Sequence, residues 1–160
     1  MSFEFKCTTC GDVHKRMPSF GFDQPLGYFE VPEEQSDARC ELGGDDCVID
    51  AKWFFIRGCI EIPLHGEDEP FSWGVWVSVS KGSFDSWTAF FHQAERSHIG
   101  PFFGWLNASL KPYPDTLKLK TKVHLRDEGI RPYIEIEPTH HPLAVEQRED
   151  ISVEWLISTR

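Results

Sequence analysis

The clearest pattern along the chain is an alternation of apolar and polar positions that begins near Val48. Between residues 53 and 62, one face carries Phe54, Ile56, Gly58, Ile60 and Ile62, and the other carries Trp53, Phe55, Arg57, Cys59 and Glu61. A period of two residues is that of a β-strand, and apolar side chains on both faces indicate a strand inside a sheet. We therefore predict a central strand in this segment.

The segment 73–80 repeats the alternation and predicts a second strand, which the polar loop 65–70 joins to the first. If the two strands pair as a hairpin, Ile62 faces Trp73, Ile60 faces Val75 and Ile56 faces Val79. This register keeps one face of the hairpin wholly apolar, as a strand pair over a hydrophobic core requires.

A helical period replaces the alternation after Ser83, which is a good N-cap residue. Aromatic residues recur at helical spacing until Gly100 and Pro101 stop the pattern: Phe84, Trp87, Phe90 and Phe91. This pattern predicts a helix at about 83–96 whose aromatic stripe packs on the sheet. The segment 102–110 is expected to be extended, and 143–147 is compatible with a helix.

A basic stripe runs through the segment 117–126, where apolar residues alternate with Lys118, Lys120, Lys122, His124 and Arg126. Such a stripe suggests an anion or RNA site. A hairpin closed by residues 127–130, however, places Lys122 opposite Glu135 and Lys120 opposite Glu137. The same register pairs Val123 with Ile134 and Thr121 with Ile136, so we interpret the stripe as a surface face neutralised by its own partner strand.

These elements predict one α+β domain over residues 1–160, built on a mostly antiparallel, twisted sheet with one or two packed helices. An irregular, cysteine-bearing lead is expected over 1–46, the sheet with its helix over 47–137, and a loop followed by a helix or tail over 138–160. The length of 160 residues and the hydrophobic content of 40% fit a single domain with its own core.

The composition adds a strongly acidic character, with a formal net charge of −10 at pH 7. Nucleic-acid binding depends on Lys and Arg residues that neutralise phosphates, so a nucleic acid is disfavoured as the main partner and a basic protein surface is favoured. The sequence shows neither the apolar segment of a signal peptide nor a run long enough to span a membrane. We therefore expect a cytoplasmic protein without a membrane partner.

The most specific chemical motif is Cys7-Thr-Thr-Cys10-Gly11, which is half of a zinc site, because two thiolates at this spacing can chelate one Zn²⁺ ion. A tetrahedral site needs further ligands, and His14, Cys40 and Cys47 are the candidates, with Cys47 preferred. Two other interpretations remain open. The cysteines can be reduced structural thiols, or they can form a redox pair.

A second group of reactive residues lies near the C-terminus, where His140 and His141 follow Glu135 and Glu137. Imidazoles and carboxylates are the groups of acid–base or metal chemistry, but the same composition is typical of a polar loop. The chain shows no nucleophile motif, phosphate-binding glycine loop or HExxH arrangement. Arg57 and Glu61 share a strand face and are expected to form a structural ion pair.

Short blocks spread over nearly the whole chain form a distinctive combination: Cys7-x-x-Cys10-Gly-x-x-His14, Cys47-Val-Ile-Asp50 before Phe54-Phe-Ile-Arg-Gly58, Trp73-Gly-Val-Trp-Val-Ser78, Phe103-Gly-Trp105, Tyr113-Pro-Asp-Thr-Leu117 and Pro138-x-x-His141-Pro-Leu-Ala144. Together they resemble the bacterial family named domain of unknown function 2199. The resemblance implies bacterial origin, a single domain and family cysteines at 7, 10 and 47, which favours Cys47 over Cys40 as a zinc ligand. The family name implies no reaction and no partner.

The leading functional hypothesis is a non-enzymatic, acidic protein-binding module, either immunity- or antitoxin-like or regulatory, with zinc as a stabiliser of its N-terminal part. Negative surface charge would speed the capture of a basic partner. The alternative is a small metal-dependent or hydrolytic enzyme with its site near His141. A third hypothesis is a zinc-stabilised module that senses thiol oxidation through Cys7 and Cys10.

Overall fold

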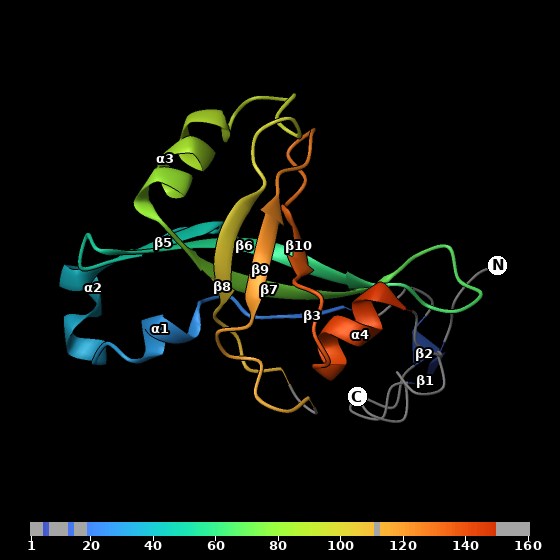
Figure 1. The fold of residues 1–160 in the computed structure, drawn as a ribbon. Coiled ribbons are helices and arrows are strands. Elements are labelled where there is room, and N and C mark those ends of the chain that lie inside the picture. Colours follow the sequence, from blue (N-terminus) through green and yellow to red (C-terminus); the bar gives the residue numbers. More distant parts are fainter. Residues whose placement is uncertain (1–4, 7–12, 15–18, 111–112, 150–160) are drawn as a thin grey trace.

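The computed structural model describes residues 5–6, 13–14, 19–110 and 113–149 (Figure 1). Its helical elements are α1 (Leu26–Phe29), the 3-10 turn η1 (Glu33–Gln35), α2 (Ser36–Arg39), α3 (Lys81–Phe90) and α4 (Pro142–Arg148). A two-stranded sheet pairs β1 (Phe5–Lys6) with β2 (Val13–His14). The other strands form one sheet: β3 (Ser19–Gly21), β4 (Cys40–Leu42), β5 (Asp46–Ile49), β6 (Trp53–Ile62), β7 (Phe71–Val79), β8 (Phe102–Leu106), β9 (Lys120–His124) and β10 (Tyr133–Ile136).

The sheet is closed, because β6 pairs with β7 on one edge and with β10 on the other, while β7, β8, β9 and β10 pair in series. Strands β6 to β10 therefore form a closed five-stranded barrel, and the predicted α+β fold built on a twisted sheet is wrong. The helices formed by the described residues are few and short. The alternation of apolar and polar positions could not reveal the closure, because a barrel strand and a sheet strand share the same period.

Closure of the barrel requires one parallel strand pair. Successive antiparallel neighbours alternate in direction, so the first and the fifth strand of the series run the same way. The parallel pair joins Cys59 of β6 to Tyr133 of β10, and the backbone N–H of Cys59 donates to the carbonyl of Pro132 at 2.8 Å. This parallel seam, the contact between β6 and β10, is short, because β5 pairs with the same edge of β6 at residues 53–56.

The side-chain amide of Gln147 in α4 extends the seam. Its Nε2 donates to the carbonyl of Ile134 at 2.8 Å, and its Oε1 accepts from the N–H of Ile136 at 2.7 Å. These are backbone groups of β10 that a neighbouring strand would otherwise bond. A buried glutamine thus completes the hydrogen bonding of β10 where β6 has diverged.

The structure confirms one predicted register and corrects the other. Strands β9 and β10 pair as predicted, with Glu135 opposite Lys122 and Ile134 opposite Val123. In the β6–β7 hairpin, Ile60 faces Trp73 instead of Val75, which is a shift of two residues from the prediction. A shift of two keeps every side chain on its predicted face, so the apolar interior is unchanged.

The barrel interior is the main core, and both longer helices cover it. Ile56, Ile60 and Ile62 of β6 are fully buried inside, together with Leu143 of α4, and α3 adds its aromatic stripe through Phe84 and Trp87. The predicted helix at about 83–96 is shorter and begins earlier. The hydroxyl of Ser80 accepts from the N–H of Ser83 at 3.1 Å and caps α3 at residue 81, and the helix ends at Phe90.

A second apolar cluster lies on the outer face of β5, β6 and β7, and it contains Val31, Cys47, Ile49, Phe55 and Trp76. The segment from β3 to β4 covers this face (Figure 1). Residues 19–46 form short strands and helices, whereas an irregular N-terminal segment was predicted there. Two buried faces explain why β6 is apolar on both sides.

Candidate functional site

One row of side chains crosses the outer wall of the barrel. The pairing registers place Lys120, Trp105, Ser78, Phe55 and Cys47 opposite one another on β9, β8, β7, β6 and β5. A groove of about 630 Å³ lies over this row, between the barrel wall and the segment that contains α1 and α2. Its volume is in the range of ligand pockets, which is roughly 300–1,000 Å³.

The floor of the groove is apolar and two indoles stand at its sides. Phe55 lines the floor and is buried, as are Val31 and Ile49, which also line the groove. Trp53 and Trp105 also line the groove, and they remain 51% and 41% exposed. Large aromatic residues that stay exposed beside a concave surface are typical of binding sites, because their apolar area is available to a partner.

An ion pair with two parallel hydrogen bonds borders the groove. Arg39 Nε and Nη2 donate to Asp50 Oδ1 and Oδ2, each at 2.8 Å, and the backbone N–H of Asp50 donates to the carbonyl of Arg39 at 2.8 Å. The hydrogen bonds from Arg39 lower the pKa of the Asp50 carboxyl. Asp50 and Ala51 have φ values of 55° and 51°, a left-handed turn that leads into Trp53. The pair therefore fixes the end of α2 to the turn before β6.

Asn107 joins the two walls of the groove. Its Oδ1 accepts from the N–H of Gly27 at 2.9 Å, and its own backbone N–H donates to the carbonyl of Trp76 at 2.8 Å. Because Oδ1 is the acceptor, the orientation of the amide is defined and Nδ2 is the remaining donor. Nδ2 has no hydrogen-bond partner in the part of the chain that the structure describes.

Charges of opposite sign flank the groove. The segment with α1, η1 and α2 carries the exposed carboxylates of Glu30, Glu33, Glu34 and Asp37. The other wall carries Lys118, which lines the groove with φ of 67°. The groove itself is lined by one carboxylate of this segment, Glu30, and by one basic residue between β8 and β9, Lys118.

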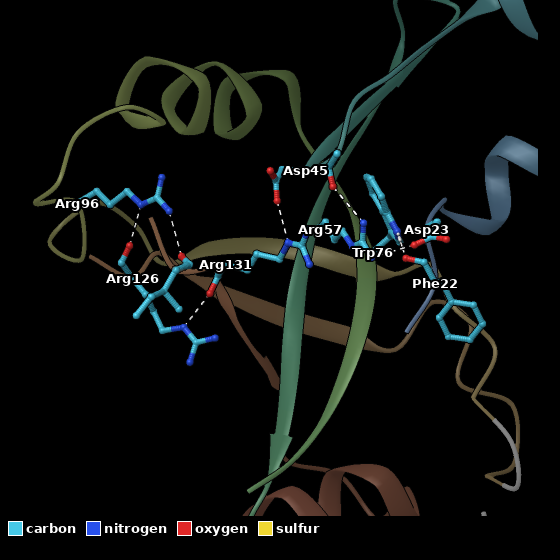
Figure 2. Close-up of polar contacts among 10 residues, drawn as sticks. Phe22, Asp23, Asp45, Arg57, Trp76, Arg96, Arg126 and Arg131 are labelled. Atoms are coloured by element: carbon cyan, nitrogen blue, oxygen red, sulfur yellow. Dashed lines mark hydrogen bonds and ion pairs between the residues drawn. The ribbon is translucent and has the colours of Figure 1, made fainter. Parts of the chain in front are cut away.

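Arg57 lies outside the groove, on the neighbouring part of the same wall (Figure 2). Its guanidinium lies 5.7 Å from the ring centroid of Trp76, its cross-strand neighbour, and bonds the Gly44 carbonyl at 3.1 Å and Asp23 at 3.3 Å. The predicted ion pair between Arg57 and Glu61 is wrong, because Glu61 bonds Arg126 at 2.6 Å. Strand twist gives each charge a nearer partner from another segment.

A buried arginine organises the loops at the α3 end of the barrel (Figure 2). Arg96 is 3% exposed and donates to the carbonyls of Arg126, Phe91 and Ile130 at 2.7, 2.7 and 3.0 Å. Asp127 accepts from the backbone N–H groups of Arg96 and Ser97 at 2.8 Å, which lowers the pKa of its carboxyl. A cavity of about 400 Å³ adjoins these loops, but its arginines are bonded to the protein itself.

His141 caps α4. Its Nδ1 accepts from the N–H of Leu143 at 3.1 Å, so Nε2 carries the proton and donates to the carbonyl of Asp115 at 2.9 Å. Both ring nitrogens are bonded to backbone, which leaves neither for a substrate. Glu135, predicted as a carboxylate near this histidine, bonds His124 instead at 2.8 Å.

The predicted zinc ligands are only partly visible. Cys7 and Cys10 lie outside the described residues, and only the backbone of His14 is described, in β2. Cys47 is fully buried beside Phe55, and burial raises the pKa of its thiol to about 12, with smaller contributions from Cys40 and Asp46. Among the described residues, no three His, Cys, Asp or Glu side chains form a metal-binding group. The zinc site stays a prediction.

Three residues of the groove were not predicted as site residues from the sequence: Trp53, Trp105 and Asn107. For Trp105, the sequence did contain a signal. The alternation in 102–106 places Phe103 and Trp105 on the face opposite buried Leu106, and both are exposed in the structure. Asn107 gave no signal, because its contact with Gly27 joins segments far apart in the sequence.

Comparisons with known proteins identify one family. The family model described as "Uncharacterized protein conserved in bacteria (DUF2199)" matches residues 6–151. No curated protein and no solved structure matches the chain. None of the helices formed by the described residues is both long and apolar enough to cross a membrane.

Proposed function

Because the chain belongs to this uncharacterised bacterial family, whose description names no activity, we propose from the site itself that the protein is a binding module that holds a segment of a partner protein in the groove. The groove flanked by Trp53 and Trp105 is the observation that carries this proposal. The partner's segment would cover both indoles and the apolar floor between them.

Exposed indoles favour protein binding for an energetic reason. Tryptophan is among the residues that contribute most to protein interfaces, because it buries a large apolar area with little loss of side-chain entropy. Trp53 and Trp105 are held on strands, so their positions are set before a partner arrives. Preorganised contact residues reduce the entropic cost of association.

The charge of the protein favours a basic partner. The net charge is −10, the carboxylate of Glu30 lines the groove, and the same segment carries further exposed carboxylates at Glu33 and Asp37. Complementary charge raises the association rate and disfavours acidic competitors. Inhibition of a basic toxin, as immunity proteins and antitoxins perform it, or regulation of a basic partner would use such a surface.

Selection from a peptide library tests the proposal without knowledge of the partner. We would select phage-displayed random peptides on the wild-type protein and measure their affinity for Trp53→Ala, Trp105→Ala and Ile130→Ala. Ile130 is the control, because it is an exposed apolar residue of the β9–β10 loop that does not line the groove. We expect enriched peptides to bind the wild type and Ile130→Ala, and to bind both tryptophan variants at least ten-fold more weakly.

Two outcomes would contradict the proposal. Peptides that bind Trp53→Ala and Trp105→Ala as tightly as the wild type would show that the groove is not the binding site. A library that yields no peptide above background would argue against capture of a protein segment. Folding of each variant would be checked by its denaturation midpoint, so that a lost fold is not taken for a lost contact.

A further inference from the structure

The segment that contains α1 and α2 forms a strap, residues 22–39, across the outer wall of the barrel between β3 and β4 (Figure 1). The structure describes every residue of the strap, and only Pro25 and Val31 among them are buried. None of the residues of α1, η1 or α2 is buried. Because buried apolar area is what holds an element to its neighbours, the strap is attached more weakly than the barrel strands are.

The wall beneath the strap is apolar and almost completely covered. Cys47, Ile49, Phe55 and Trp76 are between 0 and 5% exposed, and they form one cluster with Val31 of the strap. The backbone of the strap lies directly on this wall, since a Cβ atom added at position 27 would lie 3.1 Å from Cζ of Phe55. The strap therefore covers apolar side chains of the wall although few of its own residues are buried.

Hydrogen bonds attach the strap at both ends and near α1. At the β3 end, the indole N–H of Trp76 donates to the carbonyl of Phe22 at 2.9 Å (Figure 2). Near α1, Asn107 Oδ1 accepts from the N–H of Gly27 at 2.9 Å. At the β4 end, Arg39 makes its two hydrogen bonds of 2.8 Å to the turn before β6. Each attachment is of modest strength, because neutral hydrogen bonds and exposed ion pairs contribute little individually.

We propose that the strap opens as a unit from a barrel that stays folded, and that a partner segment in the groove holds it closed. This coupling rests on the function proposed above. One wall of the groove is the strap, through Gly27, Glu30 and Val31, and another is the barrel, through Trp53 and Trp105. A ligand that contacts both walls binds only the closed state, so it lowers the population of the open state.

The thiol of Cys47 reports opening of the strap. It is fully buried in the cluster under the strap, and burial raises its pKa to about 12, so it reacts only after it is exposed. We would treat the wild-type protein with iodoacetamide at about pH 8 in low urea and follow Cys47 by peptide mass spectrometry, which separates it from the other cysteines. We expect a labelling rate that changes little with urea concentration, because opening of the strap exposes much less surface than global unfolding.

Variants of Asn107 and Gln147 separate opening of the strap from global unfolding. Asn107→Leu leaves the N–H of Gly27 without its acceptor and should speed the labelling of Cys47 about ten-fold. Asn107→Asp is the matched control, because it keeps an oxygen for this N–H, and it should label no faster than the wild type. Gln147→Leu weakens the barrel at β10 and should leave the labelling rate in low urea unchanged.

A variant at the β4 end tests whether the strap opens as one unit. Asp50→Asn removes the charge and one acceptor of the ion pair with Arg39, and asparagine tolerates the positive φ of this position. This variant should also speed the labelling of Cys47, by about two- to three-fold, since a bidentate but exposed ion pair contributes modestly. Unchanged labelling in Asp50→Asn beside fast labelling in Asn107→Leu would overturn opening as a unit.

Peptides selected on the groove test the coupling. At a peptide concentration of about ten times its Kd, labelling of Cys47 should be about ten-fold slower, because binding removes the open state by mass action. A bound peptide that leaves the labelling rate unchanged would overturn the coupling and leave the groove as a binding site.

The labelling of the free protein decides the opening of the strap independently of any ligand. If Gln147→Leu speeds the labelling of Cys47 as much as Asn107→Leu does, the thiol is exposed only by global unfolding and the inference is wrong, whatever the groove binds. If the selection yields no peptide, the proposed function and the coupling both fail, and the labelling rates alone support or overturn the opening of the strap.

Discussion

Gly58 and Ile134 meet so closely across the parallel seam of the barrel that a Cβ atom on Gly58 would lie 2.6 Å from Cδ1 of Ile134. The same Cβ would lie 2.8 Å from the carbonyl oxygen of Pro132, a backbone atom that cannot rotate away. The glycine thus lets β6 and β10 approach closely enough to close the barrel.

Replacing Gly58 by alanine should therefore open the seam. We expect Gly58→Ala to lower the free energy of unfolding by about 1–3 kcal/mol, since overpacking of a well-packed contact costs that much. Urea denaturation would measure it. Gly44→Ala is the matched control, because its added methyl group meets no atom within 4 Å and should leave the midpoint nearly unchanged. Equal midpoints for the two variants would contradict a seam that depends on Gly58.

Gln147→Leu should destabilise the same seam from the helix side. The substitution leaves the buried carbonyl of Ile134 and the N–H of Ile136 without their partner, at a cost of about 1–3 kcal/mol for each group. Hydrogen exchange should become faster at the amide of Ile136 in particular. Glu149→Gln, an exposed change at the C-cap of the same helix, is the control and should have little effect. An unaltered Ile136 exchange rate would count against the bridging role of Gln147.

The hydrogen bonds to Asp127 predict a dependence of stability on pH. Backbone N–H donors of Arg96 and Ser97 lower the carboxyl pKa in the folded protein, so the unfolded chain takes up protons at higher pH than the folded one. The stabilisation is therefore complete above the unfolded pKa of about 3.9 and is lost as pH falls through the lower folded value. Asp127→Ala should be less stable than the wild type near neutral pH.

Urea unfolding of Asp127→Ala at a series of pH values would check this expectation. The difference in the free energy of unfolding between Asp127→Ala and the wild type should become smaller as the pH is lowered below about 4, because the wild-type carboxylate becomes protonated. Asp68→Ala removes an exposed loop carboxylate and controls for the change in net charge. A difference that stays constant down to the acid limit would contradict the role of the two N–H donors.

His141→Ala should lower stability without any loss of binding. The variant removes the cap of α4 and the bond to the Asp115 carbonyl, which we expect to cost about 0.5–2 kcal/mol. His141→Asn retains a side-chain acceptor for the Leu143 N–H and should recover part of that loss. Peptide affinity at the groove should be the same in all three proteins. Loss of affinity in both variants would indicate that His141 acts in the site.

The zinc prediction is tested by native mass spectrometry of the untagged protein. We expect a bound Zn²⁺ ion that is lost in Cys7→Ser, because removing a thiolate from a Cys-x-x-Cys pair breaks the chelate. Cys59→Ser is the matched control and should retain the ion. A wild-type protein that contains no metal would contradict the prediction of a zinc site.

The sequence carried enough information for some pairings and too little for others. The β9–β10 register was predictable because opposite charges at Lys122 and Glu135 and apolar residues at Val123 and Ile134 favour the same alignment. The β6–β7 register was not, because Phe71 and Trp73 are both bulky aromatics and the long loop between the strands imposes no alignment.

The barrel closure and the groove could not be predicted from the sequence pattern, for a different physical reason. Both depend on contacts between segments far apart in the chain, Cys59 with Tyr133 and Gly27 with Asn107, and neither contact changes the local pattern of apolar and polar residues. Trp105 shows the limit clearly. Its outward position follows from the alternation, but its place beside a groove depends on the separate segment that contains α1.

The parallel seam also determines the order in which the nascent chain can fold. Strand β6 leaves the ribosome well before β10, so the far end of its second edge stays open until residues 133–136 have been synthesised. Contacts of such long sequence separation carry a large loop-closure entropy and slow the folding of the whole domain. An unpaired, apolar strand edge can meanwhile pair with another chain. Until β10 has been synthesised, this edge of β6 is therefore a place where correct folding competes with pairing to another chain.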